Sequence, residues 1–237
     1  MAKIPTPGFS GRLGELIFYN LNGQNCVRTV PGKVRQSKAT KASASVFGRA
    51  SKLGAVIRKQ LAVIIPNPKD ISMQTRLVTT LYQWLLKVDR KESRSNQPVA
   101  LIGFPFFQQR RSLIERWKVN LTVRVLSPNE IQIRIPAFVP TVSISAPPDT
   151  ISVVCMMVSC VADVDRPVCI GSDSLELVFE YNDKPVAAQT ISFKCQTPKG
   201  SIVITGSSLH YKTAGSVSSG KLREFMPSEI VDAQYVS

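Results

Sequence analysis

From residue 119 onward the chain is a series of short segments in which apolar and polar side chains alternate, separated by turn residues. Residues 119–126 and 130–135 alternate in this way around Ser127-Pro128-Asn129, and two such segments joined by a turn predict a β-hairpin. Strands of this length and spacing favour an antiparallel β-sandwich of immunoglobulin-like character. The remaining strands of the sandwich are expected at residues 142–145, 152–162, 175–181, 186–194, 201–205 and 209–212.

The first third of the chain predicts a different organisation. Several glycines and prolines make residues 1–14 an extended, irregular arm. Residues 16–19 and 26–30 flank Asn22-Gly23, and Asn-Gly is a strong hairpin signal because both residues tolerate a positive φ. The chain therefore begins with a glycine-rich arm and a β-hairpin.

Two helices are expected next. Apolar side chains recur at three- and four-residue steps over residues 40–65 and again over residues 71–88. Gly48 and Gly54 each weaken the first helix by about 1 kcal/mol relative to alanine, so we expect them at a tight helix contact. The whole is an α+β chain with an arm, hairpin and helical pair in residues 1–97, a β-sandwich in residues 98–214 and a tail in residues 215–237.

The charge of the chain is concentrated near its beginning. The 30 Lys and Arg residues outnumber the 16 acidic residues, and residues 1–70 contain only Glu15 and Asp70 as acids. A basic block of this kind indicates contact with phosphate, with an acidic protein surface or with another copy of the chain, or simply a solvated face. The predicted basic contact face consists of Arg28, Lys33, Arg35, Lys38, Lys41, Arg49, Lys52 and Lys59.

The residues that carry chemistry are scarce. His210 is the single histidine and the carboxylates are not clustered, so the sequence predicts no catalytic residue, no metal site and no cofactor, and we expect no enzyme. Five cysteines without a C-x-x-C spacing are expected to be reduced and buried. The apolar runs at residues 98–107 and 151–162 are shorter than a membrane helix needs. Residues 1–6 lack the apolar core of a signal peptide, which predicts synthesis in the cytoplasm.

The segment Gly8-Phe9-Ser10-Gly11-Arg12-Leu13-Gly14 is rich in glycine but does not fit a phosphate-binding loop. Such loops lie between a preceding strand and a following helix, whereas here a strand follows the glycines. We interpret these glycines as letting the chain pass close to another backbone. The predicted assembly arm consists of Phe9, Gly11, Gly14, Asn22 and Gly23.

The same segment, followed by the hairpin and by Val27-Arg28-Thr29-Val30-Pro31-Gly32-Lys33, resembles the start of an uncharacterised bacterial family. Members of that family open with a G-x-x-G-[KR]-[hydrophobic]-G pattern and close the hairpin with [VI]-R-x-x-P-x-K. Arg12 stands where lysine is usual in the family. The resemblance implies a helical segment and a β-rich remainder, and it implies no catalytic residues.

These observations favour a non-enzymatic structural protein that assembles with other copies of itself into a filament, a tail-like or a shell-like particle. The arm and the tail could each reach a neighbouring copy and pair with an edge of its sheet. The alternative is a cytosolic nucleic-acid-binding protein that uses the basic first third on phosphates. The expected partners are therefore further copies of the chain, or else nucleic acid or an acidic protein surface.

Overall fold

The predicted turn at Asn22-Gly23 joins two strands. Both residues adopt the positive φ that a tight hairpin turn needs, 51° at Asn22 and 80° at Gly23. Oδ1 of Asn20 accepts a hydrogen bond from the Gly23 N–H at 2.8 Å and holds the turn closed. A further strand pairs with each side of this hairpin. The resulting antiparallel sheet has the order β1-β4-β3-β2, with β1 (Ala2–Ile4), β2 (Gly11–Leu13), β3 (Leu16–Leu21) and β4 (Gln24–Thr29). The hairpin prediction is confirmed, whereas residues 2–4 and 11–13 of the expected irregular arm form strands.

The two expected helices are α1 (Lys38–Gln60) and α2 (Met73–Arg90). They cross at Gly54, where an added Cβ would lie 3.3 Å from Cγ2 of Val78, so close packing of α2 against α1 needs a small residue at this position. Gly48 has open space beside it. Of the two glycines, only Gly54 lies at a tight helix contact.

The rest of the chain builds two antiparallel sheets. One has the order β11-β10-β7-β8, and the other has the order β5-β6-β9. Short helical segments connect the elements: η1 (Val99–Leu101), α3 (Leu113–Arg116) and α4 (Pro140–Ser143). The strands are β5 (Thr122–Ser127), β6 (Glu130–Ile135), β7 (Thr150–Asp163), β8 (Cys169–Glu180), β9 (Gln189–Phe193), β10 (Ser201–Thr213) and β11 (Ser228–Val236).

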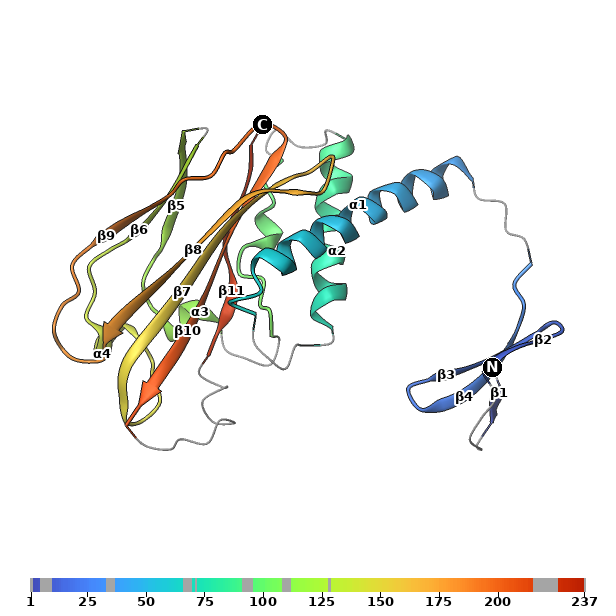
Figure 1. Cartoon of the computed structure of the whole chain (residues 1–237), viewed down its shortest axis with the longest axis horizontal. Helices are drawn as coiled ribbons and strands as arrows, with labels where there is room; N and C mark the ends of the chain where they lie inside the picture. Colours follow the sequence, from blue (N-terminus) through green and yellow to red (C-terminus); the bar gives the residue numbers. More distant parts are fainter. Residues whose placement is uncertain are drawn as a thin grey trace. The chain divides into compact units, whose positions relative to one another are not determined.

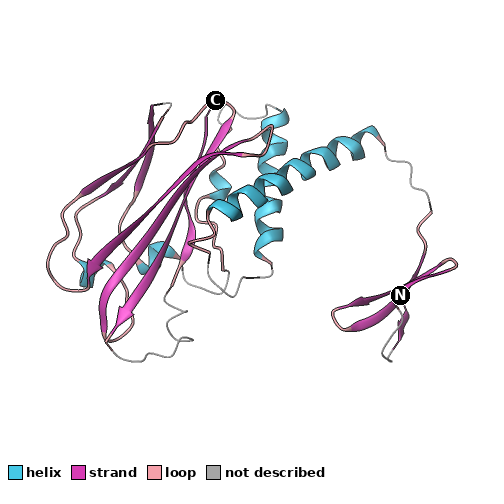
Figure 2. Ribbon diagram, viewed as in Figure 1, coloured by secondary structure: helices cyan, strands magenta, loops and turns pink. Residues whose placement is uncertain are grey.

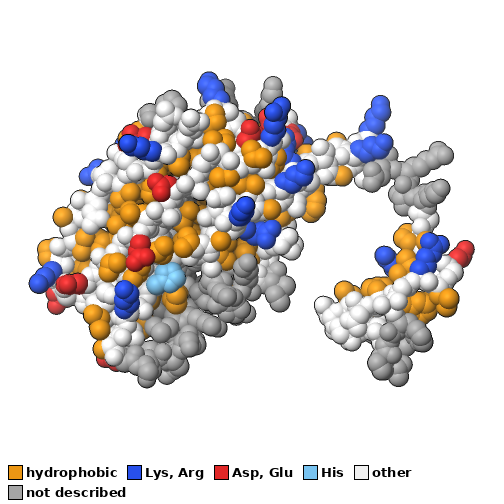
Figure 3. Space-filling view, viewed as in Figure 1, with side chains coloured by type: hydrophobic (Ala, Val, Ile, Leu, Met, Phe, Trp, Pro, Cys, Tyr) orange, Lys and Arg blue, Asp and Glu red, His pale blue; other side chains and the backbone are white. Residues whose placement is uncertain are grey.

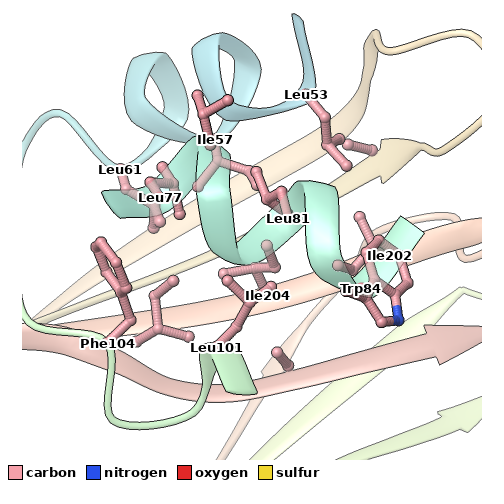
Figure 4. Packing of buried hydrophobic residues seen from close by; sticks show 14 of the residues in the cluster. Leu53, Ile57, Leu61, Leu77, Leu81, Trp84, Leu101, Phe104, Ile202 and Ile204 are labelled. Atoms are coloured by element: carbon pink, nitrogen blue, oxygen red, sulfur yellow. The ribbon is translucent and has the colours of Figure 1, made fainter. Parts of the chain in front are cut away.

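The sheet β11-β10-β7-β8, which we call the four-stranded sheet from here on, is the middle layer between α1 and α2 on one side and the sheet β5-β6-β9 on the other. Each of its faces borders one hydrophobic core. On one face the apolar sides of α1 and α2 pack on Val158, Ile202 and Ile204 (Figure 1 and Figure 4). On the other face, side chains of β7 and β10 pack against those of β6 and β9 around Trp117. The protein is thus mixed α/β with antiparallel sheets and few helices (Figure 2).

Figure 1 is a computed structural model that describes residues 2–4, 10–32, 37–65, 70, 72–90, 96–107, 112–127, 129–214 and 226–236. The chain divides into two compact units, which we call the N-terminal unit (Met1–Ser43) and the C-terminal unit (Ala44–Ser237). The division expected between residues 97 and 98 differs from this one. The physical reason is that α1 and α2 share a hydrophobic core with the four-stranded sheet and therefore belong with it.

Three strand predictions need correction. Residues 142–145 were expected as a strand, but Pro140 fixes the first turn of α4 there and only Ile144 makes an isolated bridge, to Trp117. The strands expected at residues 201–205 and 209–212 are one strand, β10, which passes through Gly206 without a break in its pairing to β7. The expected C-terminal tail contains β11, which pairs with β10 of the same chain.

Candidate interaction surfaces

The sheet of the N-terminal unit leaves several of its apolar side chains exposed. Leu13 is 72% exposed and Leu21 is 51% exposed, and Ile17 on the central strand β3 is only half-buried. Cys26, at 3%, is the one buried residue among those of this unit whose exposure the structure describes. A small sheet of this kind has no core of its own, so its apolar surface is available to a partner.

The glycines of the predicted assembly arm lie in this sheet and its turns. Gly14 turns the chain between β2 and β3 with a φ of 58°, and Gly11 begins β2 with a φ of 133°. Nothing lies within 4 Å of an added Cβ at Gly11, Gly14 or Gly23. These glycines are therefore needed for their positive φ values. The close approach to another backbone that we expected from the sequence is not seen within the described part of this chain. Phe9 lies outside the described residues.

The predicted basic contact face is divided among several places. Arg28 lies on β4 with its guanidinium 5.6 Å from the centre of the Tyr19 ring. The exposed lysines of this face all lie on α1, where Figure 3 shows blue side chains along the helix. They are Lys38, Lys41, Lys52 and Lys59. Lys33 and Arg35 lie outside the described residues.

Arg49 of α1 has a different environment from these lysines. Its guanidinium forms salt bridges to Asp89 at the end of α2 and to Asp165 in the turn after β7. This contact ties three elements of the C-terminal unit together and offsets the charge of Arg49. The sequence could not reveal the pairing, because both acids are distant along the chain.

The outer edges of the four-stranded sheet differ. The main chain of residues 103–106 pairs with one end of β11, where the Gly103 N–H donates to the Ile230 carbonyl and the Ile230 N–H donates to the Phe104 carbonyl. At the other end of β11, the side-chain amide of Gln97 donates a hydrogen bond to the Tyr235 carbonyl and accepts one from the Tyr235 N–H. Among the described strands, β8 pairs with β7 alone. The edge of β11 is covered at these positions, and β8 is the open edge.

An apolar cavity of about 400 Å³ lies beside β11, between Trp117 and Ile230. Glu229 lines it, is itself buried and accepts a hydrogen bond from the Leu113 backbone N–H. Burial raises the pKa of the Glu229 carboxyl above its ordinary value, and Glu115 nearby adds to the rise. Burial likewise raises the pKa of Asp232, three residues further along β11. These carboxyl groups therefore ionise less readily in the folded chain than they would in water.

This raised pKa predicts a pH-dependent gain from Glu229→Gln. Above the ordinary pKa of 4.5 the unfolded chain ionises at residue 229 more readily than the folded chain, so wild-type stability falls as the pH rises through the folded pKa. Glutamine can still accept the Leu113 hydrogen bond and does not ionise. We expect the substitution to raise the free energy of unfolding more at about pH 8 than at about pH 5, measured by urea denaturation.

Asp173→Asn is the control for this comparison, because Asp173 is exposed and is not among the groups that raise the pKa of Glu229. Its effect on stability is expected to be smaller and to change less between the two pH values. If Glu229→Gln instead lowered the free energy of unfolding, by as much or more at the higher pH as at the lower pH, the raised pKa of Glu229 would be contradicted.

His210 lies on β10, where its Nε2 is 3.0 Å from Oγ of Ser208. Within the described ranges, His, Cys, Asp and Glu side chains form no cluster of three or more that could hold a metal ion. The helices of the same residues include none that is long and apolar enough to cross a membrane.

No protein-family model matches the sequence, and no curated protein matches it either. The candidate site is therefore a set of interaction surfaces: the N-terminal sheet, the lysines of α1 and the open edge at β8.

Proposed function

We propose that the chain is a non-enzymatic structural protein that assembles with further copies of itself through its N-terminal unit. One observation carries the proposal, namely the apolar exposure of the N-terminal sheet. Its unit contains Met1–Ser43, and chains of about 40 residues or fewer seldom hold a fold without a disulfide, a metal or a partner subunit. The five cysteines are free thiols, so no disulfide stabilises this unit.

Burial of exposed apolar side chains would stabilise a contact of the N-terminal sheet with a partner. Covering apolar side chains contributes roughly 25 cal/mol per Å², and Leu13, Leu16 and Leu21 are all exposed on the N-terminal sheet. A second copy of the chain supplies a partner at equal concentration whenever the protein is present. Assembly into a filament, a tail-like or a shell-like particle is consistent with this contact.

The strand order of the C-terminal unit supports an immunoglobulin-like interpretation of its sheets. Numbered from β5 to β11, the first, second and fifth strands lie in one sheet and the third, sixth and seventh in the other, as in immunoglobulin domains. The fourth strand, β8, lies beside the third. Sandwiches of this type serve many functions, and the order itself favours none. For the proposed assembly, this strand order matters because it leaves β8 at a sheet edge.

Deletion of residues 1–12 tests the proposal. It removes β1 and most of β2, which leaves β3 and β4 as an isolated hairpin that is marginally stable at best. Light scattering on the 237-residue protein is expected to give a species heavier than 26.0 kDa. The truncated protein should be smaller and should keep the circular dichroism of the C-terminal unit. A monomeric 237-residue protein, or an oligomer that the deletion leaves unchanged, would contradict the proposal.

The same measurement separates assembly from the phosphate-binding alternative, which the exposed lysines of α1 favour. Absorbance at 260 and 280 nm, recorded at low and high salt, reports nucleic acid that copurifies with the protein. Binding through phosphate contacts weakens steeply as the salt concentration rises. A monomer that carries nucleic acid only at low salt would favour the alternative over assembly.

A further inference from the structure

One strand of the C-terminal unit is both open and acidic. β8 carries Asp173, Glu176 and Glu180, all exposed, and contains no Lys or Arg. Among the described side chains, none of these three carboxylates forms a salt bridge. On a chain with a net charge of +14, an acidic strand at an open sheet edge, without a salt bridge among the described residues, is a distinctive surface.

The register places two of these acids on one face with an apolar residue between them. Glu176, Val178 and Glu180 pair with Met156, Val154 and Ser152 of β7, and alternate residues of a strand share a face of the sheet. Val178 is 55% exposed despite being apolar. We call Glu176, Val178 and Glu180 the acidic row.

The N-terminal sheet carries a row of the opposite charge. Ile17 of β3 lies directly opposite Arg12 of β2 on one side and opposite Arg28 of β4 on the other. Residues that lie opposite one another on neighbouring strands share a face of the sheet. Arg12 and Arg28 are exposed and Ile17 is half-buried. We call Arg12, Ile17 and Arg28 the basic row.

The two rows match in chemistry and approximately in span. Each places an aliphatic side chain between two charges of one sign. Neighbouring strands lie about 4.8 Å apart, so the two arginines are separated by about 10 Å at the backbone. The two glutamates lie four residues apart along a strand, or about 13 Å. Arginine side chains are long enough to bridge this difference and to pair with carboxylates.

We propose that the basic row of one copy binds the acidic row of β8 in a second copy. This inference rests on the proposed function and names one contact of the assembly, on the face of the N-terminal sheet that carries Ile17; Leu13 and Leu16 lie on the other face. The occupant is a second copy because the N-terminal unit is the complement that the chain itself supplies: residues 1–43 contain seven Lys and Arg residues against Glu15 alone. The apolar contact between Ile17 and Val178 adds to the attraction between the charges.

Two charge-reversed proteins test the contact. Variant one carries Arg12→Glu and Arg28→Glu, and variant two carries Glu176→Lys and Glu180→Lys. Every substituted side chain is exposed, so the core of the C-terminal unit is not altered. Each variant alone opposes like charges at the contact, and we expect its dissociation constant for self-assembly to rise at least tenfold in sedimentation velocity at low salt.

An equimolar mixture of the two variants is the decisive sample. In the mixture, the acidic N-terminal sheet of variant one meets the basic β8 of variant two, and the unaltered sheet and strand of the two proteins also match. Assembly is therefore expected to return in the mixture. Lys52→Glu with Lys59→Glu on α1, and Glu115→Lys on α3, are matched control reversals at exposed positions and should leave assembly unchanged.

The outcomes separate this inference from the proposed function. Wild-type protein that stays monomeric overturns both. Wild-type protein that assembles, with variants that assemble equally well, overturns the contact between the rows and leaves self-assembly standing. If each variant fails to assemble alone and the mixture also fails to assemble, the basic row and the acidic row do not face each other.

Discussion

Replacement of Ile57 by alanine is expected to lower the free energy of unfolding by about 2–5 kcal/mol, because a fully buried side chain is removed and a cavity remains. Ile57 of α1 is 0% exposed and lies in the core between the helices and the four-stranded sheet (Figure 4). If the helices and both sheets form one cooperative unit, the whole C-terminal unit should lose stability together. Val63→Ala, at a position that is 53% exposed, should change stability by less than about 0.5 kcal/mol.

The two tryptophans allow the layers to be followed separately. Trp84 belongs to the core under the helices, and Trp117 belongs to the core between the sheets. Proteins with Trp84→Phe or Trp117→Phe leave one reporter each, and Ile57→Ala can be added to both. We expect both reporters to show the same shift in urea midpoint. A helical layer that unfolds at lower urea than the two sheets would contradict a single cooperative unit and would place a boundary between the helices and the sheets.

Gly206→Ala is expected to destabilise the protein by about 1–3 kcal/mol through overpacking. An added Cβ would lie 2.5 Å from Cδ1 of Ile64 and 3.1 Å from Cδ2 of Leu61. Both side chains are fully buried, so neither has free space to move into. The small residue at this point of β10 lets the chain after α1 lie directly on the sheet.

A double-mutant cycle checks that this contact is the cause. Ile64→Val removes the Cδ1 atom that the new methyl group meets, so the double variant should lose less stability than the two single variants together. Gly48→Ala is the matched control, because nothing lies within 4 Å of its added Cβ and alanine favours a helix. The control is expected to stabilise the protein by about 0.5–1 kcal/mol. Strict additivity in the cycle would refute the steric explanation.

The sequence predicted those elements whose signals are local. Asn22-Gly23 marks its hairpin because the turn needs positive φ at both positions, and the apolar stripe of α1 marks its helix because the spacing repeats within each turn. Residues 201–205 and 209–212 were predicted as separate strands, whereas Gly206 lies within one strand, where a small residue is needed against Ile64, far away along the chain. Local patterns reveal periodicity, but they do not reveal which distant side chain requires a glycine.

The strand β11 shows the same limit from the polar side. Glu229, Asp232 and Gln234 make its sequence resemble a polar tail, yet Glu229 is buried against the Leu113 backbone and the Gln234 amide donates to the Val123 carbonyl of β5. The partners of these polar groups come from remote segments. The interaction surfaces followed a similar pattern: the basic charge of the first third was evident in the sequence, whereas the acidic row appears only once β8 is placed at the sheet edge.

The division of the chain into two units has a consequence for the geometry of any particle that it builds. The basic row lies in Met1–Ser43 and the acidic row lies in Ala44–Ser237, so each copy offers two different surfaces rather than one self-complementary patch. Copies joined in this way add head to tail. Growth stops only where the rotation from copy to copy closes into a ring or a mutually exchanged pair, and otherwise continues as a polar fibre with chemically distinct ends.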